Sequence, residues 1–152
     1  MRRFWDGLAA LLLVLWVGGL WTTGYVVAPV LFARLDDNQL AGMLAGSLFA
    51  MMAWIGMVAA VYLLAYRLLR DGAAAVRTFF FLAVALMLVL TVAGQFGIQP
   101  VMQDLKDQAL PYAVMQSEFA DRFARWHGVS SVLYLIQSVL GLLLVWRSGL
   151  AR

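Results

Sequence analysis

LAGMLAGSLFAMMAWIGMVAAVYLLAY, residues 40–66, decides the fold because the whole stretch contains no charged side chain. A transmembrane helix needs about 20 consecutive, mostly apolar residues. A helix that is apolar all around is buried in lipid rather than lying on a protein surface. Lipid admits only helices and closed barrels, and this stretch is too long for a barrel strand. Residues 40–66 are therefore predicted to form a membrane-spanning helix.

Three further apolar stretches flank this one, at residues 7–33, 76–99 and 127–146. The first is longer than the apolar region of a signal peptide, so we interpret it as a retained helix. The sequence thus predicts an all-α membrane protein, a bundle of four transmembrane helices. We expect residues 1–152 to form a single membrane domain.

The composition excludes several classes of protein. The 152 residues are 64% hydrophobic and 12% charged, with a mean hydropathy of +0.88, whereas soluble domains are about 45–50% apolar and about 25% charged. A soluble enzyme, a disordered protein and a nucleic-acid binder are therefore not expected. Cysteine is absent and there is one histidine, which argues against thiolate sites and multi-histidine metal sites. No carboxylate lies inside a predicted span, so we expect no enzyme.

The distribution of basic residues predicts the orientation. If both termini are cytoplasmic, the inner flanks carry seven arginines and the outer flanks carry four basic residues. This asymmetry fits the positive-inside rule. We therefore expect a multi-pass protein of a bacterial inner membrane with both termini in the cytoplasm.

The connection between the third and fourth spans, about residues 100–126, is the longest. Its apolar residues recur at helical spacing, and oppositely charged residues four apart lie between them. Pro111 suits a helix start. We expect an outer amphipathic helical segment that either lies on the membrane surface or continues into the fourth span. The apolar positions are Met115, Phe119, Phe123 and Trp126, and the charged pairs are Glu118–Arg122 and Asp121–Arg125.

Small residues and one proline mark the first two spans. Helices in lipid associate by close packing of small residues, so Gly18, Gly19, Gly42 and Gly46 are predicted to pack within the bundle, with homodimerisation as the alternative. Pro29 removes one backbone hydrogen bond inside the first span and predicts a kink or a hinge.

Uncharged polar residues gather at one level of the predicted bundle. In the third span they recur every four residues, and in the fourth they share one helical face. Polar residues inside membranes usually face inward and pair with each other. Either an interhelical hydrogen-bond network or a ligand-binding cavity in the outer half explains the pattern. The candidate residues are Thr22, Tyr25, Gln95, Gln99, His127, Ser130, Ser131 and Tyr134, with Thr91, Gln137 and Ser138 on the same two faces.

His127 follows Trp126 at the start of the fourth span and allows three interpretations. Rings with a polar tip favour the membrane interface, where it would bond to an amide. It could also respond to pH. Imidazole with thioether sulfur suits copper, so Met102 and Met115 are candidate partners in a metal site, and a haem would need a second axial ligand. No cofactor is required by the sequence.

Several short motifs carry a family resemblance. They are WVGGLW at residues 16–21, VAPVLF at 27–32, AGMLAGSLF at 41–49 and WHGVSS at 126–131. Together these resemble the transmembrane protein 205-like family of small four-helix membrane proteins. The resemblance implies a domain of unknown function for the bacterial branch. Eukaryotic members are associated with platinum-drug tolerance and membrane trafficking, which by analogy favours a soft metal.

We therefore expect a non-enzymatic binding or interaction protein that uses the outer polar residues. One alternative is a membrane protein that handles copper or haem through His127 and methionine. Another is a small oligomeric transporter with Pro29 as hinge and Gln95 and Gln99 as lining. The expected partners are the bilayer and either a second copy of the chain or another membrane protein, but no nucleic acid.

Overall fold

The computed structural model describes residues 2–149, which form helices joined by short connections and contain no strand. Two of the four long helices contain a π-helical segment. The first consists of α1 (Arg2–Thr22), η1 (Thr23–Val27) and α2 (Ala28–Arg34). The second is α3 (Asn38–Asp71), followed by the 3-10 turn η2 (Gly72–Arg77). The third consists of α4 (Phe79–Val92), η3 (Ala93–Ile98) and α5 (Gln99–Ala109). After the 3-10 turn η4 (Val114–Gln116), the fourth is α6 (Ala120–Gly149).

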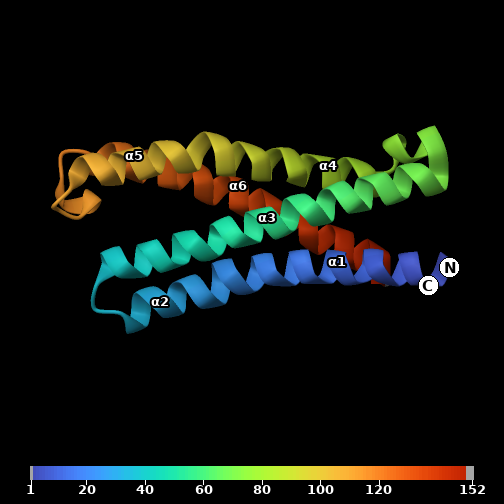
Figure 1. Ribbon diagram of the computed structural model, residues 1–152, viewed down its shortest axis with the longest axis horizontal. Helices are drawn as coiled ribbons and strands as arrows, with labels where there is room; N and C mark the ends of the chain where they lie inside the picture. The colour runs from blue at the N-terminus through green and yellow to red at the C-terminus, as the bar shows by residue number, and fades with distance from the viewer. Residues whose placement is uncertain (1, 150–152) are drawn as a thin grey trace.

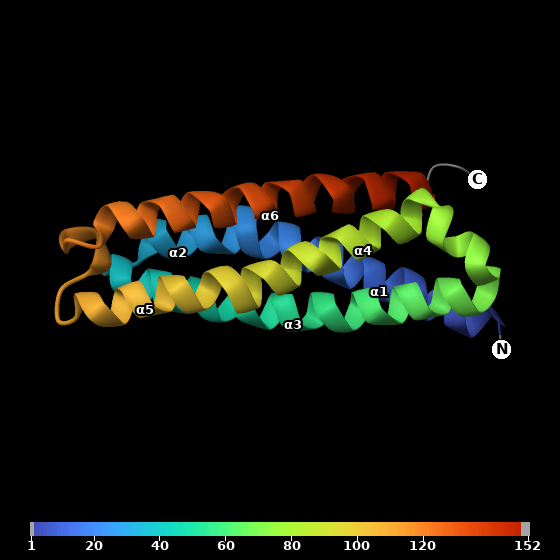
Figure 2. The same cartoon turned by 90° about the horizontal axis from the view of Figure 1, so that it is seen from above.

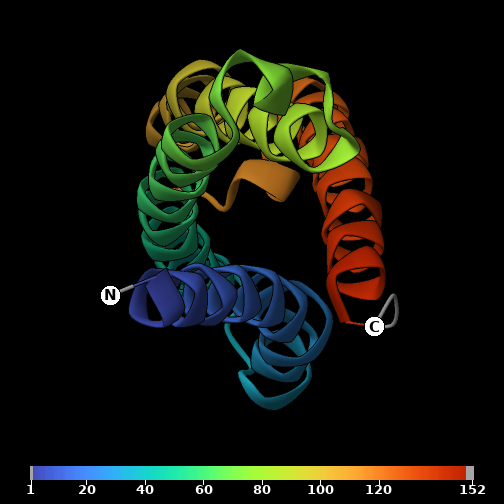
Figure 3. The same cartoon turned by 90° about the vertical axis from the view of Figure 1, so that its right-hand side faces the viewer.

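The four long helices run alternately up and down, so both ends of the chain lie at the same end of the bundle (Figure 1). We call this the terminal end and the opposite one the loop end. Seen along the bundle, the helices form a ring in the order α1, α3, α4 and α6 (Figure 3). All four are long and apolar enough to cross a membrane, which confirms the predicted four-helix membrane bundle.

The core lies between the four helices in the terminal half of the bundle. Trp16, Leu63, Met87 and Leu144 are fully buried there, and each comes from a different long helix. In the most apolar window of each span, only 22–28% of residues are buried inside the protein. The rest of that apolar surface faces outward, as a lipid-embedded bundle requires.

The connection between the third and fourth spans differs from its prediction. Residues 99–109 extend the third helix as α5, and α6 already begins at Ala120. Only the end of the expected segment, from Ala120 on, therefore continues directly into the fourth span, which was one of the two predicted arrangements. Pro111 lies in the loop after α5 and starts no helix. Pro100 has no N–H to donate, and the π-helical segment η3 just before it changes the backbone hydrogen-bond pattern. The third helix can therefore continue past the proline.

The predicted charged pairs are absent from this segment of the described chain. Glu118 precedes the first residue of α6, so it is not held at helical spacing from Arg122. Arg125 donates through Nε to the backbone carbonyl of Asp121 at 3.3 Å instead of pairing with its carboxylate.

Pro29 and Pro100 occupy equivalent positions in the first and third long helices. Each is the second residue of an α-helix, α2 or α5, that directly follows a π-helical segment, η1 or η3. The first helix changes direction where α1 passes into α2 (Figure 1). This is the kink expected at Pro29, and a sharp kink is usual where a proline and a π-helical turn coincide.

Only two of the four predicted glycines, Gly19 and Gly42, make contacts with a neighbouring helix. A Cβ atom at Gly19 would lie 3.0 Å from the sulfur of Met52, so Gly19 packs closely, whereas one at Gly18 would meet nothing within 4 Å. On α3, Ala41 and Ala45 are buried, while Gly46 also faces open space. Gly42 makes only an ordinary contact with the ring of Phe32. The prediction that Gly18 and Gly46 pack within the bundle is therefore wrong. Their sequence neighbours Gly19 and Ala45 face the bundle instead.

Towards the loop end the bundle separates into two pairs of helices. The first half of α3 packs against η1 and α2, and α5 packs against α6 (Figures 1 and 2). The loop over residues 110–119 lies within the outline of the ring when seen along the bundle (Figure 3). This separation sets the surroundings of the polar residues discussed next.

Candidate functional site

Four side chains form a polar contact between the first and fourth helices, which we call the polar seam: Trp21, Tyr25, Tyr134 and Ser138. The Tyr25 hydroxyl donates to Oγ of Ser138 at 3.0 Å. Ser138 in turn donates to the backbone carbonyl of Tyr134 at 2.9 Å. Trp21 donates through Nε1 to the backbone carbonyl of Ser138 at 3.2 Å. The seam therefore joins α6 to the end of α1 and the π-helical segment η1.

Tyr134 is the centre of the seam. Its hydroxyl donates to the backbone carbonyl of Leu20. This residue lies three positions before η1 begins at Thr23. Its ring lies 5.2 Å from the ring of Phe49 in an edge-to-face arrangement, and 6.2 Å from the ring of Tyr25. Gly24 leaves the space that the Tyr134 ring occupies. Three of the four long helices thus contribute to one aromatic and hydrogen-bonded group.

A second polar contact links the third and fourth helices. Thr91 donates through Oγ1 to Oε1 of Gln137 at 2.9 Å, and both side chains are buried. The same Thr91 oxygen lies 2.8 Å from the backbone carbonyl of Met87, so its single hydrogen is shared between two acceptors. Gln137 and Ser138 are neighbours on α6, so this one helix carries polar contacts to both of its neighbours. Such contacts between helices stabilise membrane bundles by about 1 kcal/mol each.

The structure brings together only some of the predicted site residues. Tyr25 and Tyr134 meet in the seam, whereas Thr22 is exposed and its neighbour Thr23 is buried instead. His127 is exposed, and its ring is stacked on that of Phe123 with centroids 6.0 Å apart. Ser131 is exposed and donates to the carbonyl of His127, and Ser130 is half-buried.

Gln95 and Gln99 remain apart from the seam. Both are half-buried on the third helix, one and two turns beyond Thr91. Among residues 2–149 neither amide has a hydrogen-bond partner. This contrasts with Gln137, whose carbonyl oxygen is bonded.

The candidate metal ligands lie in different surroundings. Met102 is buried on α5, whereas Met115 in η4 and His127 on α6 are exposed. The described residues also contain no group of three histidine or carboxylate side chains that could hold a metal ion.

Sequence reasoning placed Thr91, Gln137 and Ser138 on polar faces but gave them no role. Their spacing was the signal available, since they follow the candidate residues at helical intervals. Trp21 was missed because an indole near the end of an apolar stretch gives no sign of a hydrogen bond.

The comparisons with known proteins place the chain in a family. A model of a domain of unknown function, DUF4149, matches residues 11–111. The chain belongs to the DUF4149 family. The match covers most of the first helix, all of α3 and the whole third helix. The DUF4149 match therefore includes Trp21, Tyr25 and both unpartnered glutamines, while α6 lies beyond it.

No curated protein and no solved structure matches the chain. The family match, together with the four long apolar helices of this chain, makes it an integral membrane protein of unknown function.

Proposed function

We propose that this DUF4149 protein is a non-enzymatic binding or interaction protein of the membrane, and that Gln95 and Gln99 receive a polar group of its partner. The observation that carries this proposal is the pair of half-buried amides without a partner among the described residues. By helix length from Phe79, Gln95 lies inside the hydrocarbon layer, where no water meets an unpaired amide and the unpaired group is costly, and Gln99 lies at the edge of that layer. A partner that offers hydrogen bonds removes this cost.

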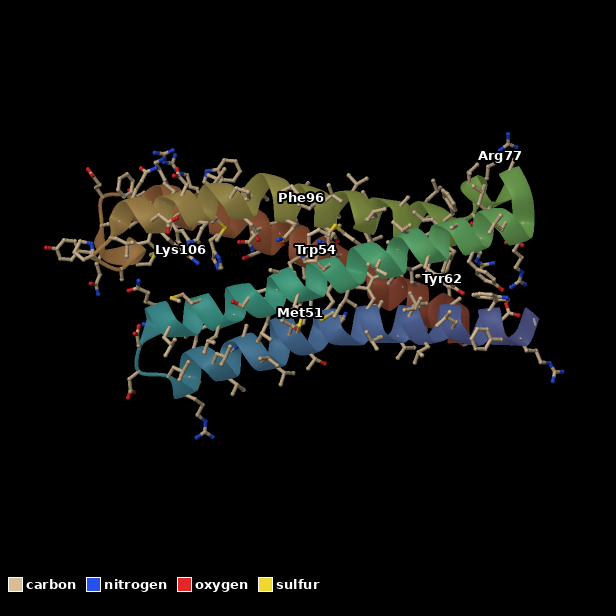
Figure 4. The ribbon with its side chains drawn as sticks, viewed as in Figure 1. Met51, Trp54, Tyr62, Arg77, Phe96 and Lys106 are labelled. Atoms are coloured by element: carbon tan, nitrogen blue, oxygen red, sulfur yellow. The ribbon has the colours of Figure 1, made fainter. Side chains whose placement is uncertain are left out.

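The surface around the two glutamines suits a membrane-embedded partner. Phe96 lies between them in the sequence and is 56% exposed, as is Trp54 on α3. The two rings meet edge to face with centroids 6.0 Å apart, and both are on the outside of the bundle (Figure 4). An aromatic surface beside unpaired amides resembles the mixture of packing and hydrogen bonding that joins helices in lipid.

Site-specific photo-crosslinking tests this proposal in native membranes. A photoreactive residue in place of Phe96 is expected to capture a defined partner, and the mass of the adduct separates a second copy of the chain from another membrane protein. Combining the probe with Gln95→Leu and Gln99→Leu should reduce the adduct several-fold. Gln103→Leu is the matched control, because that amide is already bonded to Asp107 at 2.9 Å. Equal adduct in both variants would refute a role for the two glutamines.

The orientation belongs to the same proposal. Among residues 3–147 the terminal end carries five arginines and two aspartates: Arg3, Arg67, Arg70, Arg77, Arg147, Asp6 and Asp71. This excess supports a cytoplasmic terminal end in a bacterial inner membrane. Reporter fusions after residue 112 and at the C-terminus should report opposite sides of the membrane, and only the C-terminal reporter should be cytoplasmic.

We also propose that the chain is related to the transmembrane protein 205-like family that its motifs resemble. It rests on the same motifs, of which two now have a structural setting. Trp16 is buried against Gly56, and Pro29 follows the π-helical segment η1. An uptake assay with platinum and copper compounds in cells lacking the protein tests whether the soft-metal association of that family extends to this chain.

A further inference from the structure

A cleft opens at the terminal end between three helices. It is lined by Arg67 of α3, by Phe79 and Phe80 at the start of α4, and by Leu144 and Arg147 of α6. The volume of the cleft is about 140 Å³. One water occupies roughly 30 Å³ of liquid, so this is room for one phosphate group with its oxygens.

Two aromatic rings hold the arginines of the cleft in place. The guanidinium carbon of Arg147 lies 4.2 Å from the ring centroid of Phe79, and that of Arg67 lies 4.5 Å from that of Phe80. A guanidinium stacked on an aromatic face keeps its N–H groups free at the edges. Arg147 can therefore still donate paired hydrogen bonds to an anion, and Arg67 can donate through the N–H groups that its bond to Asp71 does not use.

Of the two arginines in the cleft, only Arg147 has no carboxylate partner within the described chain. Arg67 is paired with Asp71 at 3.2 Å, and Asp6 is taken by Arg70 at 2.9 Å. No carboxylate of the described residues lies within 4 Å of Arg147. The start of α4 adds to the positive potential, because Thr78 caps only the N–H of Phe81 and leaves those of Phe79 and Phe80 without an acceptor.

The position of the cleft identifies the source of the anion. α4 begins at Phe79, directly after the last basic residue of its connection, and Arg147 closes the apolar part of α6. The cleft therefore lies where the apolar surface of the bundle meets the headgroups. Leu82, Leu86 and Leu143 continue outward from it as exposed apolar side chains. A basic pocket next to exposed apolar side chains of two spans suits a lipid phosphate with its acyl chains along those side chains.

We propose that this cleft binds the phosphate group of an anionic membrane phospholipid, with Arg147 as its main ligand and Arg67 as the second. Phe79 and Phe80 orient the two guanidinium groups, and the acyl chains lie along the exposed leucines of α4 and α6. The inference does not depend on the proposed role of Gln95 and Gln99, which lie further along the third helix.

The test uses the full-length protein in detergent, with phosphatidylglycerol added in mixed micelles. Thermal unfolding gives the apparent affinity, and native mass spectrometry counts the retained lipids. Arg147→Gln should weaken phosphatidylglycerol binding about tenfold or more, the factor that corresponds to the loss of one hydrogen bond to a charged group. Arg147→Lys should recover part of the loss because the charge is kept. Arg77→Gln is the matched control, since this arginine projects away from the bundle (Figure 4).

Three outcomes would overturn the proposal. Equal loss in Arg77→Gln and Arg147→Gln would mean that only the overall charge attracts the lipid. Equal stabilisation by phosphatidylcholine would mean that the acyl chains alone bind. Equal stabilisation by millimolar inorganic phosphate without lipid would assign the cleft to a soluble anion instead.

Discussion

The ring of Tyr134 on α6 lies so close to Gly24 of η1 that a Cβ atom at Gly24 would come within 2.7 Å of the tyrosine hydroxyl oxygen. The same hydroxyl donates to the carbonyl of Leu20, one turn earlier. Close approach and hydrogen bond therefore depend on each other, because a larger residue at position 24 would push the ring away from its acceptor. This contact fixes α6 on the first helix.

Replacing Gly24 should therefore destabilise the bundle. Gly24→Ala is expected to lower the free energy of unfolding by about 1–3 kcal/mol, the usual cost of overpacking. Gly18→Ala is the control, since nothing lies within 4 Å of its added Cβ atom and alanine favours a helix by up to about 1 kcal/mol. Thermal unfolding in detergent measures both. Equal behaviour of the two variants would contradict the close contact.

The hydrogen bond between Tyr25 and Ser138 should appear as a coupling between the two residues. Tyr25→Phe and Ser138→Ala are each expected to cost about 0.5–1.5 kcal/mol. The double variant should cost less than the sum, because the first substitution already removes the shared bond. A double-mutant cycle from unfolding in mixed micelles gives this coupling, and a value of zero would disprove the bond.

Removing the hydroxyl of Thr91 should be costly because its partner is buried. Thr91→Val leaves the Gln137 carbonyl oxygen without a donor and is expected to cost about 1–3 kcal/mol. Adding Gln137→Leu should recover part of this loss, since no buried polar group then lacks a partner. Steric trapping or reversible unfolding in micelles measures the two changes. No recovery in the double variant would argue that Thr91 acts by shape alone.

Removing the hydroxyl of Tyr62 and removing that of Tyr66 should have different effects on stability. Their rings are stacked on α3, but the Tyr62 hydroxyl is buried without a partner in the described part of the chain, whereas the Tyr66 hydroxyl donates to Asp6. Tyr62→Phe should therefore leave stability unchanged or raise it slightly, and Tyr66→Phe should lower it by about 1–2 kcal/mol. Loss of stability on Tyr62→Phe would mean that its hydroxyl has a partner after all.

The sequence predicted the number and type of the long helices because lipid imposes one strong condition on apolar length. Which face of a helix packs inward was harder to predict. Leu13, Trp16, Val17, Leu20 and Thr23 form the buried face of the first helix, and this places Thr23 inside and Thr22 outside. In an apolar helix the lipid face and the protein face look alike in composition, so the polarity pattern alone misplaced the face by one residue.

The structure brings together only some of the predicted residues for a similar reason. Tyr25 and Tyr134 were placed at one level by depth, which helix length fixes well. Their acceptors are largely backbone carbonyls and Ser138, and backbone acceptors leave no sign in a sequence. The extension of the third helix past Pro100 was also missed, because a proline in a helical pattern usually ends the helix. The π-helical turn that allows it has no reliable pattern of residues.

The third long helix is longer than the hydrocarbon layer is thick. Its 31 residues are about 46 Å long at 1.5 Å per residue, whereas the hydrocarbon layer is about 30 Å thick. A tilt of about 20° takes up only a few ångströms of the difference. Because Phe79 begins at the headgroups, α5 extends about a dozen ångströms beyond the hydrocarbon on the opposite side, through the headgroup layer. A water-soluble molecule that never enters the bilayer can therefore reach this protein from that side.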